Sequence, residues 1–218
     1  MLKKANTTPG KLIKKIIFVL AGMLIMTQGV DLFIMTGVGV DPISVFVEGL
    51  SLKLGVSFGT AQTILNCTIL VIPLLFFRKY IGLTTLIAMF LMGPFFDLYL
   101  NLEGSVITPD LGIVMKIILV AVGQVLFSFG LAVYLTPDMG GSPCDTPSVI
   151  ISKKFNIKYG TVRIFSDAIF LITGFILGGT VGLGTIVAVI FTGPISQIFR
   201  HHTYRFFTKV VPEEKYLI

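Results

Sequence analysis

Six long apolar stretches run through this chain, and they restrict its fold more than any other feature. A helix needs about 20 apolar residues to cross the hydrocarbon core of a bilayer, which is about 30 Å thick. Only 13% of the residues are charged and 54% are hydrophobic, whereas soluble domains carry about 25% charged residues. We therefore expect an all-α membrane protein with six transmembrane helices. The stretches cover residues 12–36, 60–77, 81–100, 112–135, 161–178 and 182–199.

The positions of lysine and arginine predict how these spans are oriented. Basic residues collect in cytoplasmic loops. With the N-terminus inside, every Lys and Arg except Lys53 and Lys116 falls on the cytoplasmic side. The first apolar stretch continues to about Met35 without a small-residue cleavage site, so we expect it to remain as a span. This topology explains the net charge of +6, and it places both termini in the cytoplasm.

The two halves of the chain repeat one pattern. Residues 22–66 match residues 123–167 at an offset of 101, and residues 81–94 match residues 181–194 at an offset of 100. The identities are concentrated in Gly, Pro and Thr, which shape the backbone, so they indicate a structural repeat. Chance matches in a glycine-rich chain are the alternative. Because each copy has three spans, the second enters the membrane from the opposite side, an arrangement that recurs in secondary transporters.

This organisation divides the chain into five segments. A short helix is expected inside the long connector of each repeat, at about 42–54 and 143–155. The segments are a basic cytoplasmic N-terminus (1–11), repeat 1 (12–100), an outer loop (101–111), repeat 2 (112–199) and a basic cytoplasmic tail (200–218).

Residues typical of helix ends predict the connector helices. Asp41 before Pro42 favours a helix start, and Gly55 favours a stop. Ser142 and Asn156 stand at the matching places of the second connector. Neither helix is long enough to cross the bilayer, so each lies in the interface or re-enters the membrane. One interpretation is an interfacial helix with Asp41 as a plain cap, and the other is a half-helix whose N-terminus points into a cavity and favours an anion.

Polar residues recur at matching positions in the spans. Ionisable residues inside a membrane indicate functional sites, and residues four apart share one helical face. The structural alternatives are an ion pair between Arg163 and Asp167, and an Asp97 that reaches water near the outer end of its span. The matched pairs are Gln62 with Arg163, Asn66 with Asp167, and Asp97 with Gln197.

A substrate or ion pathway between the two halves is the site that these patterns predict. The chain contains no specific catalytic, cofactor or metal-binding motif, so we expect no enzyme activity, no cofactor and no metal. A disulfide between Cys67 and Cys144 is not expected. The residues expected to line the pathway are Asp41, Gln62, Asn66, Asp97, Ser142, Asp145, Arg163 and Asp167.

The stretches GVGVDPISVFVEGLSLKLGVSFGTAQTILN and IGLTTLIAMFLMGPFFDLYL resemble the bacterial YczE/YyaS/YitT group of integral membrane proteins, closest to its YczE branch. The chain departs from the group's pattern at Thr84, where Gly is preferred, and at Ser44, where Asp145 keeps the aspartate in the second half. The group is largely uncharacterised, so the resemblance implies a bacterial multi-span membrane protein without naming a substrate. The matching residues are Gly39, Asp41, Pro42, Gly59, Thr60, Gly82, Thr85, Gly93 and Asp97.

Two functions from different classes follow from these patterns. The first is a transporter or channel for a small solute or ion, with its site between inverted repeats in the bacterial cytoplasmic membrane. The second is a membrane-embedded accessory or assembly factor without transport activity, docking through residues 200–218. The expected partners are the lipid bilayer, an unidentified small solute and, to enclose a pathway, a second copy of the chain as a homodimer. Nucleic acid binding is not expected.

Overall fold

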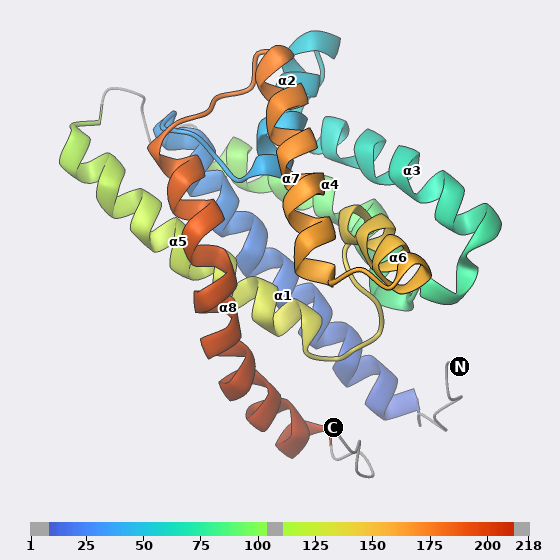
Figure 1. Ribbon diagram of the computed structural model, residues 1–218. Coiled ribbons are helices and arrows are strands. Elements are labelled where there is room, and N and C mark those ends of the chain that lie inside the picture. Colours follow the sequence, from blue (N-terminus) through green and yellow to red (C-terminus); the bar gives the residue numbers. More distant parts are fainter. Residues whose placement is uncertain (1–8, 104–110, 212–218) are drawn as a thin grey trace.

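The computed structural model describes residues 9–103 and 111–211, and these residues form helices joined by loops (Figure 1). The predicted all-α architecture with six apolar helices of membrane-spanning length is confirmed. The four short elements are α2 (Pro42–Leu54), η1 (Arg78–Tyr80), η2 (Pro143–Asp145) and α6 (Thr146–Phe155). The six long helices are α1 (Pro9–Thr36), α3 (Phe58–Phe76), α4 (Leu83–Glu103), α5 (Ile113–Leu135), α7 (Tyr159–Ile176) and α8 (Leu183–Val210).

Helix α8 continues well past residue 199, where its apolar stretch ends. The residues from Phe199 to Val210 include neither Gly nor Pro, and Pro212 follows the helix. Because those two residue types are the usual helix breakers, the helix extends through the basic segment. The first part of the predicted tail 200–218 is therefore helical. Of the predicted outer loop 101–111, residues 104–110 lie outside the described part of the chain.

The ends of the connector helices form largely as predicted. The Asp41 carboxylate accepts the backbone N–H of Ser44 at 3.3 Å and caps α2. Gly55 ends α2 with φ of 66°, and Asn156 ends α6 with φ of 55°, both in the left-handed region that these residue types tolerate. Ser142 stands at the N-cap position of η2, and its carbonyl oxygen accepts the backbone N–H groups of Asp145 and Thr146. Its side chain makes no capping bond among the described residues.

Helices α1 and α5 cross in close contact at the centre of the molecule (Figure 1). Glycines make the contact: a Cβ on Gly22 or Gly130 would collide with the backbone of the other helix, near Tyr134 and Met26 respectively. A Cβ on Gly123 would lie 2.7 Å from the Gly29 carbonyl oxygen. Small residues allow this approach between helices in a membrane.

The other elements surround this central pair. Helix α4 packs on α1, and α8 packs on α5. Helix α2 lies along α7, and η2 and α6 contact α3. Helices α3 and α4 also pack closely, whereas α7 and α8 are separated by a groove of about 430 Å³ lined by apolar residues including Leu171, Val189 and Ile190.

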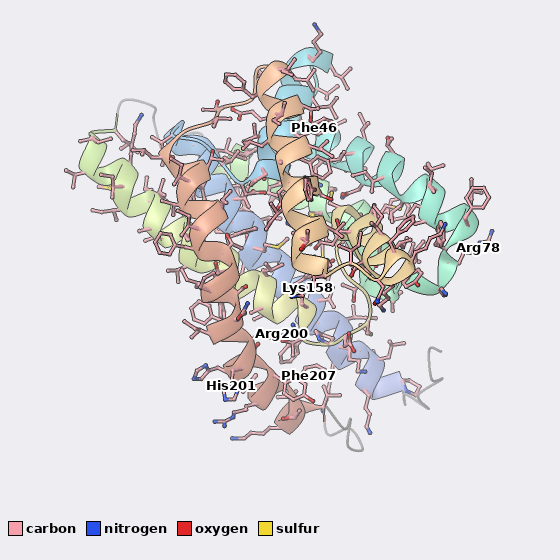
Figure 2. All side chains as sticks on the ribbon, viewed as in Figure 1. Phe46, Arg78, Lys158, Arg200, His201 and Phe207 are labelled. Atoms are coloured by element: carbon pink, nitrogen blue, oxygen red, sulfur yellow. The ribbon has the colours of Figure 1, made fainter. Side chains whose placement is uncertain are left out.

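The N-terminal end of α1 and the C-terminal end of α8 lie together. Lys14 donates from Nζ to the carbonyl oxygen of Val210 at 3.1 Å. The Phe18 ring packs edge-on against Phe207, with centroids 5.0 Å apart, and in Figure 2 the Phe207 side chain lies close to α1. The start of α1 and the end of α8 therefore lie on the same side of the bundle, as expected for six consecutive spans.

Candidate functional site

The N-terminal ends of the two short helices point toward the middle of the bundle. Helix α2 runs alongside α7 in the same direction: Phe46 stacks edge-on against Phe170 at 5.6 Å, and Gly49 packs against Gly174 near the end of α7. In Figure 2 the Phe46 label lies beside the upper half of α7, whereas Lys158 lies at its lower end. The start of α2 is therefore level with the inner part of α7, well before its C-terminal end.

Helix α6 has the corresponding relation to α3. Lys154 near its C-terminal end places Nζ 5.5 Å from the ring centroid of Phe77, directly after α3. Cys144, in the single turn η2 before α6, lies against Asn66 in the middle of α3. The second connector helix thus also starts beside the middle of a long helix and ends beside that helix's C-terminal end.

An arginine joins the second connector to α7. The Arg163 guanidinium donates from Nε to both carboxylate oxygens of Asp167, at 2.8 and 3.0 Å. Its Nη1 also forms an ion pair with Asp145 in η2. All three side chains are partly buried. The predicted ion pair between Arg163 and Asp167 is confirmed, and it extends to Asp145, which the sequence placed on a different segment.

Asp41 faces the same charges from the first connector. Its carboxylate accepts the Ser44 hydroxyl at 2.5 Å in addition to the capping N–H. Burial raises the pKa of Asp41 above its ordinary value of 3.8, against the lowering effects of the Ser44 hydrogen bonds and of nearby Arg163, while Asp167 raises it further. Asp41 is therefore both a helix cap and a partly buried carboxyl group near the arginine.

Amide groups form the other wall of the site, on α3. Gln62 donates from Nε2 to Asn66 Oδ1 at 3.0 Å, and the Cys144 thiol lies 3.5 Å from the same oxygen. Asn66 in turn donates to the Ala88 carbonyl of α4 at 3.5 Å. Burial raises the pKa of Cys144 to about 12, so this thiol is neutral at physiological pH. We call the whole set the central polar cluster: Asp41, Gln62, Asn66, Cys144, Asp145, Arg163 and Asp167.

Tyr134 of α5 adds a polar group without a partner. Its side chain is only 1% exposed, and its hydroxyl has no hydrogen-bond partner among the described residues. The hydroxyl is near enough to Cys144 for the two groups to interact electrostatically. A buried hydroxyl is normally satisfied, so the unpartnered hydroxyl of Tyr134 is an exception beside the cluster.

Six of the eight predicted site residues meet in the central polar cluster. Ser142 directly precedes it and contributes backbone contacts. Asp97 lies elsewhere: it accepts the Gly59 N–H at 2.8 Å and the Ser57 hydroxyl at 2.7 Å, so it ties α4 to the start of α3. We therefore treat Asp97 as a structural residue outside the cluster.

Sequence reasoning missed Cys144 and Tyr134. Cys144 directly precedes Asp145 in the connector, and this neighbourhood was the available signal. Tyr134 stands in an apolar helix where nothing in the sequence separates it from a core aromatic residue. Among the described residues, no three His, Cys, Asp or Glu side chains are placed to share a metal ion.

In the described part of the chain, two apolar grooves have linings that include no residue of the central polar cluster. One is the groove between α7 and α8. The other, of about 440 Å³, lies between α1, α5 and α8 and is lined by residues including Phe18, Phe129 and Phe206. The lining residues of the two grooves are therefore distinct from the cluster.

Comparison with known proteins gives a family and three uncharacterised relatives. Residues 13–201 match the family described as "Family of unknown function (DUF6198)". An uncharacterised protein of Haemophilus influenzae is 28% identical, covering 85% of this chain and 83% of the relative. The uncharacterised protein YyaS of Bacillus subtilis is 29% identical, covering 82% of this chain and 88% of the relative. The uncharacterised membrane protein YczE of the same organism is 30% identical, covering 82% of this chain and 81% of the relative. No solved structure matches the chain. The resemblance expected from the connector and span motifs is thereby confirmed.

Proposed function

Because this chain belongs to the DUF6198 family, whose function is unknown, we propose a function from its own site. It is a multi-span protein of the bacterial cytoplasmic membrane that moves a small solute or an ion through the central polar cluster. It works as a transporter or channel and catalyses no chemical reaction. The observation that carries this proposal is the convergence of both connector N-termini on one group of partly buried charged side chains and buried amide side chains.

An inverted repeat accounts for the arrangement of the helices. Each half contains a long helix, a short helix and two long helices, in that order. The first helices of the halves, α1 and α5, pack on each other, and each short helix packs on the third helix of the other half, α2 on α7 and α6 on α3. These exchanged contacts support a pseudo-two-fold axis between α1 and α5, with the cluster between the repeats, where transporters of this kind bind substrate.

In this proposal the structure represents one state of a transport cycle. Water reaches a site of this kind alternately from the two sides when one repeat rocks against the other. The groove between α7 and α8 leaves space for these two helices of the second half to move. Helices α3 and α4 of the first half pack together and have no such space.

The test is the accessibility of single cysteines to a membrane-impermeant thiol reagent, on a Cys67→Ser, Cys144→Ser background. We expect Asn66→Cys and Asp167→Cys to be labelled from opposite sides of the membrane. Asp138→Cys, in an exposed loop, is the positive control, and Phe165→Cys, 68% exposed on the outer face of α7, is the lipid-facing negative control. Silence at 66 and 167 with a labelled control at 138 would reject transport through the cluster.

One observation favours the second function, an accessory or assembly factor. The C-terminal half of α8 exposes Arg200, His201, Arg205 and Lys209, and Figure 2 labels the first two of these on this part of the helix. Photo-crosslinking from position 201, with Ile172 on the lipid-facing side of α7 as a matched control, would test this surface. A specific crosslinked protein, combined with silent cysteines in the cluster, would favour the accessory function.

A further inference from the structure

We propose that the central polar cluster is a proton site in which Asp41 binds the proton and Arg163 acts as a latch. With Asp41 protonated, Arg163 pairs with Asp145 and Asp167, as in this structure, and holds the second connector against α7. When Asp41 releases its proton to water, its carboxylate competes for Arg163 and the hold on Asp145 weakens. This inference rests on the proposed function and names its coupling ion.

The charges in the cluster favour binding of one positive charge. Three carboxylates, on Asp41, Asp145 and Asp167, face one guanidinium. The converging N-terminal ends of α2 and of the η2–α6 segment contribute partial positive charges, each equivalent to about half an elementary charge. One negative charge is therefore left over when all three carboxylates are ionised, and a single proton on the cluster removes it.

Asp41 is the carboxylate that takes this proton. Asp145 and Asp167 both pair with Arg163, whereas the hydrogen bonds shown for Asp41 come only from Ser44. The groups that interact electrostatically with Asp41 are Arg163 and Asp167 on α7 and Cys144 in η2. The residues of α3 in the cluster are uncharged amides. The raised pKa of Asp41 agrees with this assignment.

Arg163 can act as a latch because it joins two segments that are otherwise separate in the chain. It stands on α7, against which α2 packs on one side and α6 on the other. A guanidinium has five N–H donors in a rigid fork, so it can exchange one carboxylate for another without losing its own hydrogen bonds. The choice between Asp41 and Asp145 therefore decides which connector start Arg163 holds, while packing keeps both short helices on α7.

The Tyr134 hydroxyl is a second, independent sign that the cluster accepts a small polar ligand. It is buried, unpartnered among the described residues, and next to the Cys144 end of the cluster. A water molecule bound there would satisfy the hydroxyl and could carry a proton to or from the cluster. The thiol beside it stays neutral and does not compete for that proton.

The latch is tested by measuring the distance between two spin labels in the full chain in lipid nanodiscs. Ile151→Cys on α6 and Ile164→Cys on α7 are exposed attachment sites on the cysteine-free background. We expect one short distance at low pH and a second, longer distance as the pH rises through a midpoint above 3.8, the ordinary pKa of an aspartate. Asp41→Asn, which keeps the cap, should lose the transition and retain the short distance at every pH.

Further variants separate the latch from a general effect of charge. Asp145→Asn removes the ion pair between Arg163 and the second connector, so this variant should give the long distance at every pH. Asp138→Asn makes the same chemical change on an exposed loop residue and should behave as the wild type. A wild-type distance that does not respond to pH, or an unchanged midpoint in Asp41→Asn, would overturn the proposal. A distance that follows Na⁺ or K⁺ concentration at constant pH would also overturn it and would assign the site to a metal cation.

The two proposals fail in different ways. Cysteines at 66 and 167 that label from opposite sides, together with a pH-independent spin-label distance, would leave transport standing and reject the proton latch. Silent cysteines would reject transport through the cluster, whatever the spin labels report.

Discussion

At the scale of single residues, Asn66 joins three segments at one buried amide. It is fully buried, accepts from Gln62 and Cys144, and donates to Ala88. These bonds connect α3, η2 and α4. A buried polar group that loses its partner bears the full cost of its desolvation, so this residue has more influence on the cluster than its lack of charge suggests.

Asn66→Ala should lower the thermal stability of the detergent-solubilised protein. The change leaves the Gln62 amide and the Cys144 thiol without their shared acceptor, and an unsatisfied buried group costs about 1–3 kcal/mol. The measurement is a melting curve followed by size-exclusion chromatography. Thr68→Ala, on the exposed side of the same helix with a bond only to Ile64, is the matched control and should melt close to the wild type. Equal melting of both variants would show that the Asn66 bonds contribute nothing.

Asp41→Asn should change how stability depends on pH. Because burial raises the pKa of Asp41 in the folded state, the folded protein holds a proton that the unfolded chain has lost, and stability falls as the pH rises from 3.8 through the raised pKa. The asparagine keeps the cap on Ser44 and cannot ionise, so the variant should be the more stable protein above this window. Melting curves from pH 4 to pH 8 test this; parallel curves for both proteins would contradict it.

At the scale of elements, glycines decide how closely helices approach, and the two halves differ. A Cβ on Gly93 of α4 would collide with the Gly59 carbonyl and Thr63 of α3. Its counterpart in the second half, Gly193 of α8, has no neighbouring atoms within 4 Å. Glycines at matching positions therefore allow close packing of α3 with α4, whereas α7 and α8 make no such contact at Gly193.

Gly93→Ala should destabilise the protein, whereas Gly193→Ala should be tolerated. The first change forces α3 and α4 apart, because the atoms that it meets include backbone. The second changes only helix propensity, which favours Ala over Gly by about 1 kcal/mol. Melting temperatures of the two variants, purified side by side, measure the difference. Loss of stability in both would mean that α7 and α8 pack together in the membrane.

At the scale of the whole molecule, the pairing of the two ends restricts the topology. Lys14 near the start of α1 bonds to Val210 at the end of α8, so these two helix ends lie on the same side of the bundle. The excess of lysine and arginine predicts that this side is the cytoplasm. Arg78, at one outer edge of the view in Figure 2, belongs to a loop that the same rule places inside.

Reporter fusions should identify that side. Green fluorescent protein fused at the C-terminus should fluoresce, and alkaline phosphatase at the same place should be inactive, because the phosphatase requires the oxidising exterior. A phosphatase inserted in the predicted outer loop 101–111 should be active. The reverse pattern would invert the topology, and activity at both places would contradict the six-span arrangement.

Much of the local structure could be predicted from the sequence, because it depends on neighbours in the chain. The lengths of the apolar stretches indicated six spans, and Asp41, Gly55 and Asn156 marked helix ends through their own backbone preferences. These features need no knowledge of which helices are neighbours.

The partners of the polar residues were decided only by the tertiary structure. Arg163 and Asp167 are one helical turn apart and could be paired from the sequence, but Asp145 reaches Arg163 only because α6 packs on α7. Asp97 looked equally important and instead ties two helices together. The sequence by itself determined which segments are helical and apolar, since those properties are local. Only the fold decided which buried polar groups meet, because hydrogen bonds and ion pairs depend on distances between residues far apart in the chain.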